Sequence, residues 1–199
     1  MESKYGFHLV HDTQTVFRAL LDATANPGRE QEAKAQVARL KGASNGMELA
    51  IALTLLDNEV TFFERDGALS EEIAFLTRAR PEPLHWADLV FVGEGEDPDA
   101  VLPYVKSGTL ERPDDSATVF VRVDENGESL CAALTGPGIP PESDSFDLPA
   151  AATRWLRARQ ALAIEYPRGV DLVFFTAEGR FLALPRLTQI REGETSWLM

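Results

Sequence analysis

The sequence predicts an α/β sandwich whose β-sheet is mixed, with both parallel and antiparallel strands. Segments with a helical period alternate with short apolar segments, which is typical of strands connected by helices. Residues 89–92 form an unbroken apolar run that indicates an interior strand. Two hairpin signals, at residues 117–135 and 170–184, require antiparallel pairing as well. The 199 residues contain no internal repeat or linker, so we expect one domain over residues 1–199.

The first element is expected to be an amphipathic helix at residues 12–25. Apolar side chains recur there at intervals of three and four residues, while Arg18 and Asp22 point away from them. The positions expected on the buried face are Val16, Phe17, Leu20, Leu21 and Thr24. The sequence Asn-Pro-Gly at 26–28 ends this helix, because proline disfavours helical geometry in the residue before it. The polar stretch 30–41 indicates a short strand or a loop.

A second helix is expected to begin at Ser44 or Asn45, because Asn45 and Glu48 have the spacing of a capping box. This helix is apolar on nearly all sides, which is typical of a helix buried in the core. A strand at residues 60–63 follows it. The next helix is short, and Ser70 is its expected N-cap.

The strongest local signal is the hairpin over residues 117–135. Valine alternates with other side chains in its first half, and Asn126-Gly127 is a favoured two-residue turn. A long helix is then expected at residues 148–164. The second hairpin joins a strand at 170–176 to a strand at 180–184.

The composition excludes several classes of function. A net charge of -13 repels phosphate backbones, and no run of Lys and Arg offsets it locally, so we expect no nucleic-acid partner. The first residues lack a basic region followed by an apolar stretch, and the longest apolar helical segment is too short to cross a bilayer. A single cysteine, Cys131, allows no intrachain disulfide. The sequence therefore predicts a cytoplasmic protein without a membrane contact.

Candidate catalytic and metal-ligating residues are scarce. His8 and His11 have an i, i+3 spacing, but only His85 remains to complete a ligand set, so we expect no metal site. None of the four lysines has the context of a Schiff-base lysine, and Lys106 is expected to neutralise a helix C-terminus. No serine lies in a nucleophile motif. We therefore expect no catalytic residue and no cofactor.

Residues 134–139 (Leu-Thr-Gly-Pro-Gly-Ile) form the most distinctive short motif. In one interpretation, Gly136 and Gly138 let backbone amides approach a phosphate or phosphonate group. In the other, Pro137 and Gly138 occupy the centre of a type II turn and only reverse the chain. The turn is favoured, because the Lys and Ser or Thr that complete a phosphate-binding loop are missing.

Arg168, Arg186 and Asp171 form a candidate polar cluster at the ends of the second hairpin. Arginine binds carboxylate and phosphoryl oxygens with two parallel hydrogen bonds, so this cluster has the chemistry to hold an anionic ligand or a partner chain. An internal ion pair with Asp171 is the favoured alternative, because it is a common arrangement at the start of a strand.

Several motifs, taken in order, resemble one known family. They are FRALLDA at 17–23, Asn-Pro-Gly at 26–28, LTLLDNEVT at 53–61, Ser-Gly-Thr at 107–109, the strand at 117–121, LTGPGI at 134–139, YPRGVDL at 166–172 and Leu-Pro-Arg at 184–186. In order and approximate spacing, the chain resembles the H subunits of bacterial carbon-phosphorus lyase systems over residues 16–190.

The resemblance implies a three-layer α/β fold related to the large domain of pyridoxal-phosphate-dependent transferases, without that cofactor. It also implies a homodimer within a multi-subunit complex that uses organophosphonates as a phosphorus source. In that pathway an alkylphosphonate displaces adenine from ATP, and the H subunit is a required, non-catalytic partner of this step. The alternative is a free-standing enzyme that binds a nucleotide or phosphonate through Gly136, Gly138 and the two arginines.

Overall fold

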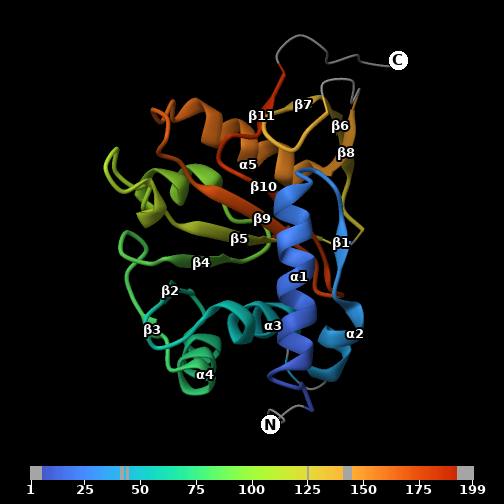
Figure 1. The fold of residues 1–199 in the computed structure, drawn as a ribbon, viewed down its shortest axis with the longest axis vertical. Helices are drawn as coiled ribbons and strands as arrows, with labels where there is room; N and C mark the ends of the chain where they lie inside the picture. The colour runs from blue at the N-terminus through green and yellow to red at the C-terminus, as the bar shows by residue number, and fades with distance from the viewer. Residues whose placement is uncertain (1–5, 41–42, 44, 125, 141–144, 192–199) are drawn as a thin grey trace.

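A seven-stranded mixed sheet lies at the centre of the computed structural model, which describes residues 6–40, 43, 45–124, 126–140 and 145–191. The strand order is β1-β10-β9-β5-β4-β2-β3 (Figure 1). The strands are β1 (Gln31–Glu32), β2 (Thr61–Phe63), β3 (Arg80–Pro81), β4 (Leu89–Val92), β5 (Thr118–Arg122), β9 (Asp171–Phe175) and β10 (Arg180–Leu184). The five strands from β9 to β3 are parallel, whereas β10 and β1 add antiparallel pairs, so the prediction of a mixed sheet is confirmed.

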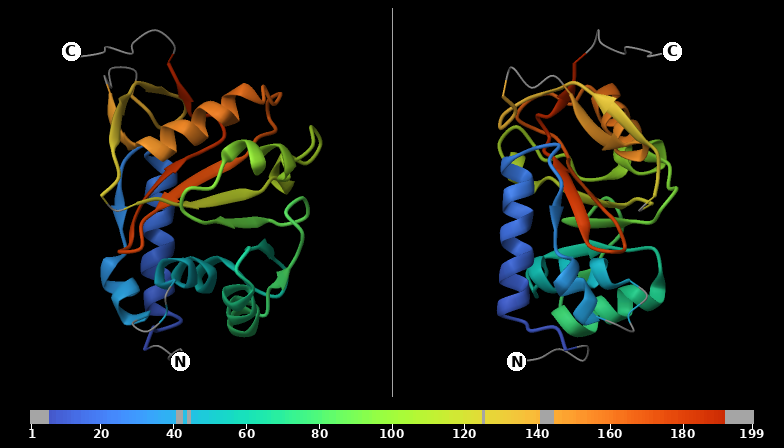
Figure 2. Two further views of the ribbon diagram at one scale, coloured as in Figure 1. Left: turned by 180° about the vertical axis from the view of Figure 1, so that it is seen from behind. Right: turned by 90° about the vertical axis from the view of Figure 1, so that its right-hand side faces the viewer.

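Helices cover both faces of this sheet, which gives three layers (Figure 2). One face packs against α1 (His11–Ala25), α3 (Gly46–Leu55) and α4 (Gly67–Thr77). The other face packs against α5 (Ala150–Ala161) and two short 3-10 turns, Pro98–Ala100 and Leu102–Tyr104. Side chains of the central strands alternate between the two layers: Phe120 joins the first apolar cluster, and its neighbours Val119 and Val121 join the second.

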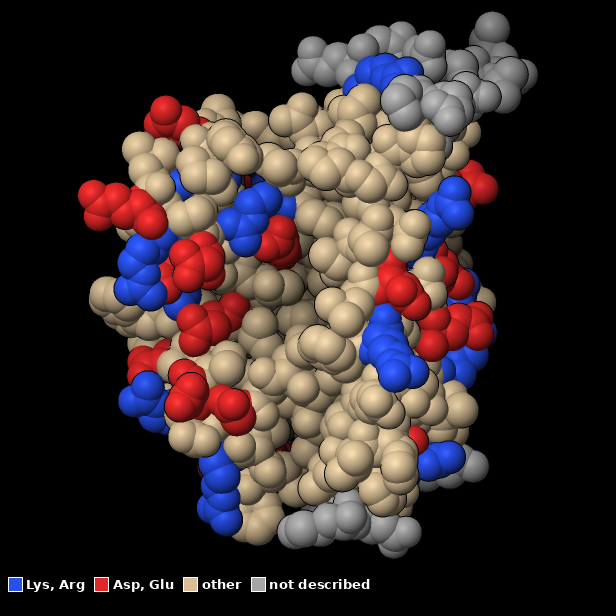
Figure 3. All heavy atoms as spheres, viewed as in Figure 1, with Lys and Arg blue, Asp and Glu red and all other residues tan. Residues whose placement is uncertain are grey.

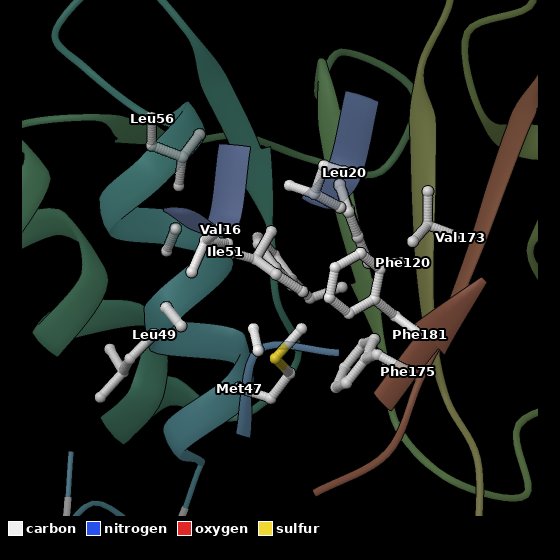
Figure 4. Packing of buried hydrophobic residues seen from close by; sticks show 14 of the residues in the cluster. Val16, Leu20, Met47, Leu49, Ile51, Leu56, Phe120, Val173, Phe175 and Phe181 are labelled. Carbon is white, nitrogen blue, oxygen red and sulfur yellow. The ribbon is translucent and has the colours of Figure 1, made fainter. Parts of the chain in front are cut away.

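The first apolar cluster fills the space between α1, α3 and the sheet. Figure 4 shows Val16 and Leu20 of α1 and Met47 and Ile51 of α3 facing Phe120 of β5, and all of these side chains are buried. Burying apolar surface of this kind is the main favourable contribution to folding. Packing of apolar side chains thereby holds α1 and α3 against the sheet.

Two short two-stranded sheets flank the central one. The antiparallel pair β6 (Ser129–Ala132) and β8 (Phe146–Pro149) leads into α5. The antiparallel pair β7 (Leu134–Thr135) and β11 (Gln189–Ile190) links the motif at 134–139 to the last described segment. The remaining elements are α2 (Lys34–Val37) and the 3-10 turns Ala38–Leu40 and Pro113–Asp115.

Several predicted elements are confirmed, but the predicted buried face of the first helix is half wrong. The helix at 12–25, the strands at 60–63 and 89–92, and the second hairpin correspond to α1, β2, β4 and β9–β10. Val16 and Leu20 of α1 are buried as expected, whereas Phe17 is 45% exposed and Leu21 is 52% exposed. The helix lies on the outside of its layer, and its contacts with the core run along one narrow stripe.

The predicted hairpin over residues 117–135 is wrong. Its first half is β5, which runs parallel to β4 on one edge and to β9 on the other, so both edges are occupied. Part of its second half is β6, which pairs with β8 in a separate sheet. Burial explains the error: Val119, Phe120 and Val121 are all buried, because a central strand is covered on both faces. Alternation of valine with other residues therefore did not distinguish a hairpin strand from a central parallel strand.

The predicted start of the second helix is confirmed, because Asn45 is the N-cap residue of α3, but the predicted capping box is wrong. The side chains of Asn45 and Glu48 instead accept hydrogen bonds from Arg122 of β5, each over 3.1 Å. Ser44 lies outside the described residues. Helix α4 begins before Ser70, and the Asp66 carboxylate caps it by accepting a hydrogen bond from the Ala68 amide.

The last helix is shorter than predicted at both ends. Residues 146–149 belong to β8, where Leu148 is buried, and α5 ends at Ala161. The polar stretch 30–41 contains β1, α2 and a 3-10 turn over its described part, so it is more ordered than a loop. Among the helices of the described ranges, none is both long and apolar enough to span a bilayer.

Candidate functional site

A cavity of about 240 Å³ lies where β5 and β9 begin and β10 ends. We call it the arginine pocket, because three arginines lie in its wall. Its polar lining residues are Arg159, Gln160, Arg168, Arg186, Thr188 and Gln189. Two of the arginines, Arg168 and Arg186, are those that the sequence singled out as an anion-binding cluster, and the fold brings them to one cavity.

The guanidinium group of Arg186 binds acceptors within the protein. It forms an ion pair with Asp171 over 2.6 Å and donates hydrogen bonds of 2.6 Å to the Pro113 carbonyl and the Ser116 hydroxyl. The Arg186 amide donates a further hydrogen bond of 2.7 Å to the same Asp171 carboxylate. The favoured prediction of an internal pair with Asp171 is therefore confirmed. This pair ties the end of β10 to the start of β9 and to the segment before β5.

Arg159 lies in α5 and is 5% exposed. Its guanidinium donates to three backbone carbonyls, those of Val170 (2.9 Å), Leu184 (2.6 Å) and Thr188 (2.6 Å). The pKa of Arg159 is lowered to about 10, chiefly by burial and also by the positive charge of Arg186, although the charge of Asp171 opposes this shift. The group therefore stays charged at neutral pH and places a buried positive charge in the wall of the pocket.

Arg168 retains unused donors. Its Nε atom is buried, and no hydrogen-bond partner for it exists among the described residues. The Thr188 hydroxyl, in the wall of the same pocket, is also buried without a partner there. A buried polar group without a partner is costly unless a ligand or water satisfies it. These two groups are the ones that a bound molecule would reach.

The charges of the pocket do not balance. Three guanidinium groups line it, and no carboxylate is among the lining residues, while Asp171 neutralises Arg186 from one side. A cavity with surplus positive charge and free donors attracts a small anion, because charged hydrogen bonds to phosphoryl or carboxylate oxygens are the strongest that arginine makes. The arrangement has the chemistry to bind an anionic group.

The glycine motif forms the predicted turn. The Ile139 amide donates to the Gly136 carbonyl over 3.2 Å, and Gly138 has a φ of +83°, which are the features of a type II turn. A Cβ on Gly138 would lie 2.6 Å from the Ala25 carbonyl oxygen, and one on Gly136 would lie 2.8 Å from that of Leu187. Both glycines therefore allow close backbone packing, and Gly136 adjoins Thr188 of the arginine pocket. Their proposed contact with an anion stays a prediction.

The other candidate residues have internal roles in the described structure. His8 Nδ1 accepts hydrogen bonds from the amides of Val10 and His11, so it faces the start of α1. Within the described ranges, no three His, Cys, Asp or Glu side chains are placed to hold a metal ion. Lys106 pairs with Asp88 rather than with a helix C-terminus. Burial raises the pKa of Asp88, but the hydrogen bonds from Lys106 and Thr61 outweigh it, so this pKa is lowered overall.

Sequence reasoning missed Arg159, which holds the pocket together. The signal was present: Ala152, Leu156 and Arg159 recur at helical spacing, so the arginine continues an apolar stripe toward the core. An arginine at a core-facing position must find several acceptors when buried. Val170, directly before β9, Leu184 at the end of β10, and Thr188, after the hairpin, supply them.

Residues 6–191 match the model of a family described as bacterial phosphonate metabolism protein (PhnH). The chain is 35% identical over 205 aligned positions to the alpha-D-ribose 1-methylphosphonate 5-triphosphate synthase subunit PhnH of Rhizobium meliloti, covering 91% of each chain. It is 30% identical over 177 positions to the C-P lyase subunit protein HtxG of Stutzerimonas stutzeri, covering 89% of this chain and 85% of the relative.

Proposed function

Because this chain belongs to the PhnH family of bacterial phosphonate metabolism proteins, we propose that it is a subunit of a carbon-phosphorus lyase system. In this role it acts with partner subunits to form the ribose triphosphate of an alkylphosphonate from ATP and the phosphonate. The single observation that carries the proposal is the family match over residues 6–191, nearly the whole chain. We propose a cytoplasmic location, which a single exposed cysteine, Cys131, supports.

We propose that the subunit is non-catalytic and needs no cofactor of its own. The scarcity of reactive side chains supports this: the candidate lysine Lys106 is paired with Asp88, and the pocket arginines are donors rather than nucleophiles. A relationship to the large domain of pyridoxal-phosphate-dependent transferases is part of the same proposal. The parallel strands with helices on both faces support that relationship.

In this proposal the arginine pocket holds a phosphonate or phosphate group. The free donors of Arg168 and the buried charge of Arg159 support an anion of this size. Gly136, which adjoins Thr188, would let the backbone come close to the same anion. No specific observation favours the alternative of a free-standing enzyme.

We further propose a homodimer that associates with the other subunits through an apolar surface on α1. Val10, Phe17 and Leu21 are 60%, 45% and 52% exposed, and their spacing places them on one side of the helix. Figure 3 shows that the middle of this face is largely uncharged, with Lys, Arg, Asp and Glu gathered mainly toward its two sides. Exposed apolar stripes of this kind are typical of protein–protein contacts.

A growth experiment tests the subunit role. A strain of the source bacterium that lacks this gene should not grow with methylphosphonate as the sole phosphorus source, and should grow normally on phosphate. The wild-type gene should restore growth. Normal growth of the deletion strain on methylphosphonate would contradict the proposal.

The stripe on α1 is tested with Phe17→Glu and Leu21→Glu, which place charge on it without touching the core-facing side. We expect these variants to sediment as monomers and to copurify less with partner subunits. Thr15→Glu, at an exposed position on another side of the same helix, is the control for added charge. Unchanged sedimentation and copurification would remove the stripe from the interface.

A binding experiment tests the pocket separately. Calorimetry of the purified chain with methylphosphonate should show binding that Arg168→Gln weakens by about tenfold, the worth of one charged hydrogen bond. Arg157→Gln changes an exposed arginine on α5 and should bind as the wild type does. Equal binding by the Arg168 and Arg157 variants would remove the pocket from the proposal and leave the family-based role untouched.

A further inference from the structure

A second cavity, of about 310 Å³, lies at the opposite end of the parallel strands. We call it the switch-point cavity. Its wall includes Glu64, directly after β2, residues 91–94 at the end of β4, and Arg122, the last residue of β5. All of these positions are at the carboxyl ends of parallel strands.

The cavity lies where the order of the strands in the sheet reverses. From β2 the chain goes to β3 on one side, and then returns to place β4 on the other side of β2. The sheet therefore reverses its direction of growth between β2 and β4. In open α/β sheets, ligands bind outside the carboxyl ends of the strands at such a reversal. The switch-point cavity is lined by residues that directly follow both of these strands, Glu64 and Gly93.

The wall of the cavity is strongly acidic. Four carboxylates line it, and they are Glu48, Glu64, Asp66 and Glu94. The single guanidinium in the wall, that of Arg122, is already bound to Glu48 and Asn45. Three carboxylates therefore have no cation to balance them among the lining residues. A group with positive charge and hydrogen-bond donors is complementary to this wall.

Two carboxylate oxygens in the wall are buried without a partner. Glu48 is 6% exposed, and its Oε2 atom has no hydrogen-bond partner among the described residues, although Oε1 binds Arg122. Glu64 Oε2 is likewise buried and unpartnered there. Burial raises the pKa of both carboxyl groups. At Glu64 the charges of Asp66 and Glu48 add to the rise, and hydrogen bonds from the backbone of Asp66 and Arg65 oppose it. One oxygen of each carboxylate therefore lacks the donor that a buried carboxylate oxygen normally has.

We propose that the switch-point cavity is a binding site for an organic cation, a small molecule that presents a primary ammonium or a guanidinium group to Glu48 and Glu64. The cation supplies the missing donors and the missing positive charge in one step. Gly93 leaves the entrance open, since a Cβ there would meet no atom within 4 Å. An anion is repelled by the same carboxylates. A bare metal ion is not favoured, because these carboxylates do not form a group of three with ligating geometry.

Agmatine, which carries one ammonium and one guanidinium group, is a suitable probe. We expect calorimetry at low salt to show one agmatine bound to each wild-type chain. Glu64→Gln should weaken this binding by about tenfold, since it removes one charge-assisted hydrogen bond. Glu178→Gln, on the exposed turn after β9, has the same change in charge and should bind agmatine as the wild type does.

Two results would overturn the proposal. One is agmatine binding of equal strength in the wild type and in a folded Glu64→Gln chain, or no binding in either. The other is equal binding of 1,4-butanediol, which has donors of similar spacing and no charge. Glu48→Gln provides a second variant if Glu64→Gln does not fold. Neither result bears on the carbon-phosphorus lyase role, which the growth experiment tests.

Discussion

The two cavities of this protein lie at opposite ends of the same parallel strands and differ in what their charges do. In the arginine pocket, Arg159 and Arg186 donate to backbone carbonyls and to Asp171, so these charges connect segments of the fold. In the switch-point cavity, Glu48 and Glu64 each keep an unpartnered buried oxygen, so these charges are poorly compensated. The arginines at the first end therefore connect segments of the fold, whereas the two glutamates at the second end each leave one buried oxygen without a donor.

This difference shows why buried charge alone does not indicate function. A buried cation that reaches several carbonyls has a structural explanation, and only its leftover donors point to a ligand. A buried carboxylate without enough donors has no such explanation, and it is more informative about binding. Variants that remove one charge from each end separate these two cases.

The largest effect is expected from Arg159→Met. The variant keeps an apolar stem of similar length but leaves the carbonyls of Val170, Leu184 and Thr188 without this donor. We expect the free energy of unfolding to fall by about 4 kcal/mol, measured by urea denaturation. Arg157→Met, at an exposed position of the same helix, should change it by less than about 0.5 kcal/mol. A similar small effect in both variants would break the comparison.

A smaller loss is expected from Arg186→Ala. The substitution leaves the half-buried Asp171 carboxylate without its cation and removes hydrogen bonds to Pro113 and Ser116. We expect a loss of about 3 kcal/mol in the same measurement. The matched control is Arg112→Ala, which breaks an exposed pair with Asp115 and should cost at most about 1 kcal/mol. Equal losses would show that the pocket gives its ion pair no added strength.

The smallest effect, and one of opposite sign, is expected at the acidic end. The pKa values of Glu48 and Glu64 are raised above the ordinary carboxyl value of 4.5, chiefly by burial. As the pH rises from that value, the unfolded chain loses these protons before the folded chain does, so the free energy of unfolding falls. Glu64→Gln should reduce this fall, and should not destabilise the chain at neutral pH.

Urea midpoints of the wild type and of Glu64→Gln, measured as the pH rises from 4.5 to neutral, test this predicted fall in stability. Glu178→Gln is the control for an exposed carboxylate and should leave the slope unchanged. A slope that is the same in Glu64→Gln as in the wild type would show that Glu64 is well compensated in the folded chain. The contrast between the two ends would then rest on the arginines alone.

Local signals in the sequence were sufficient for elements whose partners lie close in the chain. Helix α1, strand β4 and the hairpin of β9 and β10 follow from periodicity and turn residues within a few positions. These local signals were insufficient where a residue far away in the sequence binds the same side chains. Asn45 and Glu48 have capping-box spacing, but Arg122, more than seventy positions away, takes both side chains. The Asn126-Gly127 turn signal did not reveal that β4 and β9 occupy both edges of β5.

The candidate sites divide in the same way. The pair of Arg186 and Asp171 could be predicted because both flank one hairpin. The arginine pocket as a whole could not, since Arg159 comes from α5 and its acceptors lie before β9, at the end of β10 and in a later segment. The switch-point cavity depends on strand order, which needs the register of β2, β4 and β5. No local pattern around Glu48 or Glu64 encodes that order.

The edge strands of the central sheet affect how this protein can associate with other chains. Each outermost strand, β1 and β3, has only two residues, and β3 ends in Pro81, which has no amide hydrogen to donate. A neighbouring chain therefore finds almost no free backbone ladder to extend at either margin. Edge-to-edge pairing of the central sheet with the sheet of a second chain, the step that extends a fibril, is therefore disfavoured in this fold.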